Sequence, residues 1–167
     1  MTSLLTGRRD FLAGIAAAIS SPAAGAAKTI AQTVLGPLDA SQLGVTLPHE
    51  HVAEGAYYLR KWPRDWGGRG EFVARTVEKL QVVRAAGIGT IVDLTTYDVF
   101  RDIGFLEEIS RKSGLHMIAA TGQRFFPPNV AGVAMPALTI AVRAAFFTGE
   151  IREGMDGTAI KAGVIKI

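Results

Sequence analysis

Residues 71–95, EFVARTVEKLQVVRAAGIGTIVDLT, contain the two kinds of element that decide the fold. From Glu71 to Ala86 the apolar residues recur every three or four positions, which is the spacing of a helix that buries one face. Gly87 is expected to end this helix, and the β-branched run from Thr90 to Thr95 predicts a strand. A helix followed by a strand across a short turn is one half of a βαβ unit.

The same alternation continues on both sides of this stretch. We expect further strands at 43–52, 116–121 and 163–167, and further helices at 102–112 and from about 136 to 152. Strands that alternate with helices of this length form parallel sheets, so the predicted fold class is α/β. The strands are apolar on both faces, which leaves a barrel and an open doubly wound sheet as alternatives. Neither a G-x-G-x-x-G motif nor a Walker loop is present, which disfavours the nucleotide-binding version.

Length and composition narrow the classes of protein. The chain has 167 residues, of which 49% are hydrophobic and 20% charged, as in an ordinary globular domain. A closed (β/α)8 barrel needs at least about 200 residues, so these residues can supply only part of one. The net charge of +3 comes from basic residues scattered among acids, which does not predict nucleic-acid binding. The chain has no cysteine, which excludes disulfides and thiolate chemistry.

Residues 1–27 have the order of a secretory signal. Arg8 and Arg9 precede an apolar run at 13–19, and small residues follow at 21–27. The twin arginine predicts Tat export to the periplasm or out of the cell, with 28–167 as the mature domain. An amphipathic first helix is the alternative, but the run is mostly alanine without a polar stripe. The run is also far shorter than the roughly 18 residues that span a bilayer, so we expect no stable membrane anchor.

His49-Glu50-His51 is the sharpest local motif. In a strand, residues two apart share a face, so both imidazoles would project together at the carboxyl end of the first strand. Barrel enzymes place their active sites at that end, and imidazole is a common ligand for zinc. By itself, an H-x-H pair is more often a surface or hydrogen-bonded pair than a metal site.

Lys166 lies inside the last predicted strand, on the same face as Val164. Burial favours the neutral, nucleophilic form of a lysine amine, which can react with carbon dioxide to give an anionic carbamate. The alternative is that the end of the strand exposes the lysine to water, as is the rule for lysine.

These residues lie within a longer resemblance. In order and spacing, the chain resembles bacterial phosphotriesterases and phosphotriesterase-like lactonases of the amidohydrolase superfamily. The segments that carry the resemblance are 33–38, 43–51, 59–63, 87–93, 101–102, 119–122, 127–128 and 161–166.

The resemblance implies a (β/α)8 TIM barrel, of which this chain would be the N-terminal half. His49 and His51 would bind the more buried of two divalent metal ions, most commonly zinc, and Lys166 as its carbamate would bridge the two ions. A hydroxide held between the metals would attack phosphorus or a carbonyl carbon of a small-molecule ester, lactone or organophosphate. A homodimer is one arrangement open to the full-length enzyme.

Two departures from the family pattern bear on activity. Family members carry two more histidines and an aspartate on later strands, which have no counterpart before Ile167. We therefore expect the isolated chain to be an incomplete, inactive fragment. Where the family carries Trp or Tyr, this chain has Arg124 and Phe125, and Arg124 would either favour an anionic substrate or lie in solvent. Trp62 is a further candidate for the substrate mouth, or pins a loop to the rim of the barrel.

Three interpretations of function follow from the sequence. The first is a metal-dependent hydrolase of phosphotriesters or lactones, and the second is a lactonase whose phosphotriesterase activity is incidental. The third is a non-catalytic remnant or gene-model fragment.

Two other polar residues are assigned structural roles. Asp93 is expected to be a hydrogen-bonding group on the second strand, and His116 lies at the start of the third strand, far from the catalytic end.

Overall fold

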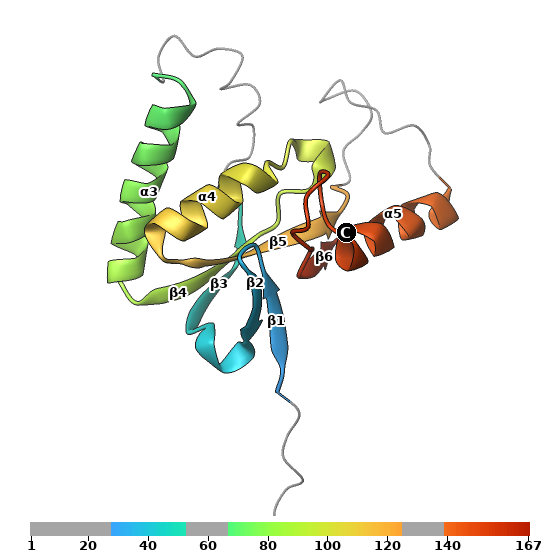
Figure 1. Ribbon diagram of the computed structural model, residues 1–167, viewed down its shortest axis with the longest axis horizontal. Coiled ribbons are helices and arrows are strands. Elements are labelled where there is room, and N and C mark those ends of the chain that lie inside the picture. The colour runs from blue at the N-terminus through green and yellow to red at the C-terminus, as the bar shows by residue number, and fades with distance from the viewer. Residues whose placement is uncertain (1–27, 53–66, 125–138) are drawn as a thin grey trace, which may run out of the picture.

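The computed structural model describes residues 28–52, 67–124 and 139–167 (Figure 1). The predicted signal at 1–27, Trp62 and Phe125 lie outside these ranges. The described elements, in chain order, are β1 (Ile30–Thr33), β2 (Gly36–Asp39), the 3-10 helix η1 (Ala40–Gln42), β3 (Val45–Glu50), α3 (Arg69–Ala85), β4 (Ile88–Asp93), the 3-10 helix η3 (Tyr97–Val99), α4 (Ile103–Ser113), β5 (His116–Gly122), α5 (Ile140–Arg152) and β6 (Val164–Lys166).

Four of the strands form one parallel sheet in the order β3-β4-β5-β6. An open doubly wound sheet reverses its strand order at a switch point, and these four strands do not. Helices α3 and α4 lie side by side, with α3 against β4 and α4 against β5, while α5 packs on β5 further along the sheet (Figure 1). A curled parallel sheet with sequential strands and outer helices is the first half of a TIM barrel, which confirms the predicted fold class.

Helix α4 is bounded by the residues that its sequence predicts. The side chain of Asp102 caps the N-terminus by accepting a hydrogen bond from the Phe105 amide at 3.0 Å. Gly114 ends the helix in the left-handed conformation, with φ of 73°, which glycine adopts without steric cost. These two residues set the length of the helix that covers β5.

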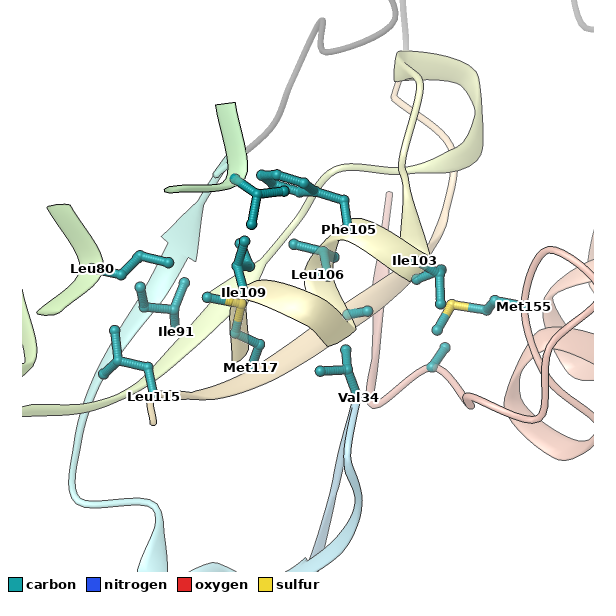
Figure 2. Close-up of a cluster of buried hydrophobic side chains, with 13 residues drawn as sticks. Val34, Leu80, Ile91, Ile103, Phe105, Leu106, Ile109, Leu115, Met117 and Met155 are labelled. Carbon is teal, nitrogen blue, oxygen red and sulfur yellow. The ribbon is translucent and has the colours of Figure 1, made fainter. Parts of the chain in front are cut away.

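The hydrophobic core lies between the sheet and helices α3 and α4. The rings of Phe72 and Phe105 stack with their centroids 5.1 Å apart, which joins the two helices. Figure 2 shows Ile109 of α4 above Met117 of β5, with Leu80 of α3 on the same side of the sheet. The predicted apolar face of α3 is buried or partly buried as expected and consists of Phe72, Val73, Val77, Leu80 and Val83.

Helix α5 is formed within the predicted range but exposes part of its apolar side. Ile140 is 87% exposed and Ile151 is also exposed. The buried residue of α5 is instead the acid Glu150. Helix α5 therefore contacts the rest of the described chain through this carboxylate as well as through Phe146, whose ring meets that of Tyr97.

An antiparallel hairpin, β1–β2, precedes the parallel sheet and was not predicted. It pairs Ile30 with Asp39 at its open end and Thr33 with Gly36 at its turn. Val34 at the turn is buried, and its amide donates a hydrogen bond to the carbonyl of Met117 at 2.8 Å. The hairpin thus lies against the amino end of β5, away from the carboxyl ends of the strands (Figure 1).

Among the described helices, none combines the length and the apolar character that a bilayer-spanning segment requires.

Candidate metal centre

His49, His51 and Lys166 meet at the carboxyl ends of the strands. The two imidazole rings have centroids 5.6 Å apart and are inclined at 63°. Lys166 ends β6, and its Nζ lies 3.5 Å from Nε2 of His49. β3 and β6 are the first and last strands of the sheet, so only a curled sheet can bring these side chains together. The structure thus gathers three of the predicted site residues in one place.

The three side chains fit a divalent cation of the zinc type. Neutral imidazoles are preferred ligands of such ions, and three protein ligands with an open position is the usual catalytic arrangement. Lys166 is half-buried, and its carbamate would add an anionic oxygen donor beside the two histidines. Within the described ranges no group of three or more His, Asp or Glu side chains is arranged to hold a metal ion, and the side chain beside His49 is that of Lys166.

The ring of His51 is supported by the end of the neighbouring strand. Its Nδ1 lies 3.0 Å from the hydroxyl of Thr95. The buried carboxylate of Asp93 accepts hydrogen bonds from the amides of Val52 and Thr95, both at 2.8 Å. The predicted hydrogen-bonding role of Asp93 is confirmed. The Asp93 carboxylate thus links Val52, which follows His51, to Thr95, which contacts the His51 ring.

A buried ionic cluster lies beneath the end of β5. The side chains of Arg101 and Glu150 are 0% and 5% exposed and form an ion pair. Arg101 also donates to the Asp156 carboxylate at 2.8 Å and to the Ala120 carbonyl at 2.9 Å. Burial opposes the charge on the guanidinium, but the hydrogen bonds to Glu150 and Asp156 outweigh it and raise the pKa of Arg101 above its usual value.

This cluster was not predicted as a functional group. The acidic partners of Arg101 lie 49 and 55 positions further along the chain, so the sequence around Arg101 carries only the family resemblance. The Thr121 hydroxyl donates to Glu150 at 2.5 Å, so the cluster joins α5 and the segment before β6 to the end of β5. No local pattern could have identified it.

The end of β5 pairs with β6, the strand that ends at Lys166. Gly122 lies opposite Lys166 in the parallel register, and the Gln123 amide donates to the Lys166 carbonyl at 3.1 Å. Arg124 follows directly, and its amide donates to the buried carboxylate of Asp98 at 3.2 Å. Arg124 therefore sits at the same edge of the sheet as the candidate metal ligands.

Three further residues of the sequence analysis are not part of this group of side chains. His116 begins β5 and is at the opposite end of the sheet, as predicted. Trp62 and Phe125 lie outside the described residues, so their role in the substrate mouth stays a prediction.

Comparison with known proteins shows the family of the chain. Residues 29–167 match the model of the phosphotriesterase family. The chain is 31% identical over 140 residues to the phosphotriesterase homology protein of Mycobacterium tuberculosis, covering 80% of this chain and 43% of that protein. It is 30% identical over 161 residues to the N-acetyltaurine hydrolase of Rattus norvegicus, covering 80% of this chain and 46% of that protein.

A solved structure shows the same fold. A mutant of the organophosphorus hydrolase from Deinococcus radiodurans superposes with a TM-score of 0.65 at 33% identity, covering 85% of this chain and 44% of that one. The chain thus spans less than half the length of each of these relatives. The family match extends over almost every residue after the predicted signal, and this chain belongs to the phosphotriesterase family.

Proposed function

We propose that this chain contributes the first half of the active site of a metal-dependent hydrolase. One observation carries the proposal: Lys166, which follows His49 by 117 positions in the chain, converges with His49 and His51 at the end of the sheet where barrel enzymes act. The family that the chain belongs to is generally metal-dependent, which agrees with this donor set.

Each of the three side chains has a definite task in this proposal. His49 and His51 would hold one divalent ion as neutral imidazoles, and zinc is the expected metal. Lys166 would add an anionic oxygen donor, because its Nζ can add to carbon dioxide and lose a proton to give a carbamate. Bound divalent ions lower the pKa of water and polarise the scissile bond of a phosphotriester or lactone.

The complete reaction is expected to require a complete barrel. The described residues supply three of the donors, whereas a two-metal site needs more, so we expect the 167-residue chain by itself to bind a metal ion weakly and to hydrolyse nothing measurable. We further propose that the protein is exported by the Tat route, from the twin arginine at Arg8 and Arg9.

The metal site is tested with the chain itself. Replacing His49 with alanine removes one ligand and should weaken Zn²⁺ binding by at least about 100-fold, in line with the 10–100-fold loss seen for supporting residues alone. His116→Ala is the matched control, because this histidine lies at the other end of the sheet and should leave the affinity unchanged. Competition with a chromophoric chelator measures both affinities. Equal Zn²⁺ affinities of His49→Ala and His116→Ala would contradict the proposed metal site.

A second candidate substrate class is an anionic amide. The vertebrate relative is named for N-acetyltaurine, an amide that carries a sulfonate group, and its identity to this chain equals that of the phosphotriesterase relatives to within a few per cent. Arg124 stands at the site edge in the position where triesterases and lactonases carry an aromatic residue, and its guanidinium has the charge that a sulfonate or carboxylate requires.

Replacement of Arg124 by methionine separates the two substrate classes. In the complete enzyme, an anionic amide substrate should lose about 2–3 kcal/mol of transition-state binding, which is roughly 30- to 150-fold in kcat/KM, whereas a neutral lactone should be hardly affected. Rates on an N-acyl aminosulfonate, a lactone and an aryl phosphotriester measure this. If the lactone or the phosphotriester is the better substrate and is insensitive to the change, the anionic class is wrong.

A further inference from the structure

The hydroxyl of Thr95 and the ring of His51 form a contact between two neighbouring strand ends. Thr95 follows β4, whereas His51 follows β3, and the Oγ1–Nδ1 distance is 3.0 Å. Thr95 is 2% exposed, so water does not compete freely for its hydroxyl. A buried hydroxyl against one ring nitrogen restricts the rotation of the ring, and it either accepts the proton of Nδ1 or donates its own to Nδ1, depending on the tautomer.

Asp93 holds the threonine in place independently of the ring. One carboxylate oxygen accepts from the Thr95 amide and the other from the Val52 amide, each at 2.8 Å. The Leu94 amide donates to the Glu50 carbonyl at 2.8 Å, which continues the pairing of β3 with β4 up to this point. The hydroxyl of Thr95 is therefore presented to His51 by a backbone that is fixed on both sides.

We propose that Thr95 is a positioning residue that selects the tautomer of His51 for metal binding. Because Nδ1 faces the hydroxyl, a metal ion can be bound only through Nε2. Nε2 has a lone pair for the metal only when the proton is on Nδ1, and this proton is then donated to Oγ1 of Thr95. The inference rests on the proposed role of His51 as a metal ligand.

A merely structural role for Thr95 makes different predictions. If the threonine only fills space in the core, valine should replace it without loss, because valine has the same shape and lacks only the hydroxyl. If the hydroxyl orients the ring, valine should weaken metal binding and serine should preserve it. The proton position on the ring, which a packing role does not control, separates the two roles directly.

The experiment uses the 167-residue chain and Zn²⁺. Thr95→Val should weaken Zn²⁺ binding by about 10- to 100-fold, the range found for groups that orient metal-ligating histidines. Thr95→Ser retains the hydroxyl and should bind Zn²⁺ nearly as tightly as the unaltered chain. Without metal, the ¹⁵N shifts of the His51 ring should show the proton on Nδ1 in the unaltered chain and in Thr95→Ser, and a mixture of tautomers in Thr95→Val.

The other outcomes contradict either the role of Thr95 or the proposed metal role of His51. Equal Zn²⁺ affinity of Thr95→Val and the unaltered chain, with a large loss in His51→Ala, overturns the inference and leaves the metal site intact. No loss in His51→Ala overturns the proposed metal role of this histidine itself. If Thr95→Val does not fold by far-UV circular dichroism, the ring ¹⁵N shifts of the unaltered chain decide, because a proton found on Nε2 overturns the inference without any variant.

Discussion

Replacing Arg101 with methionine is expected to destabilise the folded chain by about 3–5 kcal/mol, the cost of removing one partner of a buried ion pair. Methionine is of similar length but carries no charge, so the carboxylate of Glu150 would stay buried beside the Thr121 hydroxyl alone. The Ala120 carbonyl would also lose its donor. Urea denaturation followed by far-UV circular dichroism measures the change in the free energy of unfolding.

Arg75→Met is the matched control for this change. Arg75 pairs with Glu71 one helical turn away on α3, and its side chain is 57% exposed. Exposed pairs of this kind contribute less than about 1 kcal/mol, so the control should unfold almost as the unaltered chain does. Equal losses for the two arginine variants would mean that the Arg101 cluster does not hold α5 to the sheet.

Replacing Gly122 with alanine is expected to separate β6 from β5. Gly122 has φ of 123°, and a methyl group there would lie 1.8 Å from the carbonyl oxygen of Lys166. The strained backbone and the overlap should together cost about 2–6 kcal/mol. Because the overlap falls on the residue that carries the site amine, Zn²⁺ affinity should fall together with stability. Denaturation and chelator competition on the same preparations measure both.

Gly149→Ala should have the opposite effect. Gly149 lies inside helix α5, and a methyl group there would meet no atom within 4 Å apart from the adjoining backbone of its own helix. Alanine is favoured over glycine in a helix interior by about 0.5–1 kcal/mol, so this variant should be slightly more stable and bind Zn²⁺ unchanged. If Gly122→Ala is as stable as Gly149→Ala, the close approach of β5 and β6 is not needed for the fold.

Much of the parallel half-barrel could be predicted from the sequence, because its signals are local. The helix periodicity at 71–86 and the stops at Gly87 and Gly114 depend on neighbours in the chain, and α3 and α4 begin and end within two residues of the expected positions. The projection of His49 and His51 to one side also follows from the alternation of a single strand.

The parts that could not be predicted depend on distant residues. The hairpin β1–β2 turns at Val34 and Leu35, which lack the Asn-Gly or Asp-Gly signal of a tight turn. The burial of Arg101 depends on acids that reach it from α5 and the following loop. The range of α5 could be predicted, but that its buried residue is the acid Glu150 could not.

The hairpin also has a consequence for the order of events during synthesis. It closes on itself within about 1–10 μs, but its buried Val34 docks on Met117, which leaves the ribosome roughly eighty residues later. At about 5–20 residues per second, this delay is roughly 4 to 17 seconds. During that interval the hairpin has no β5 to pack on, and a chaperone has time to bind it. The first of the described elements to be made is therefore expected to dock late.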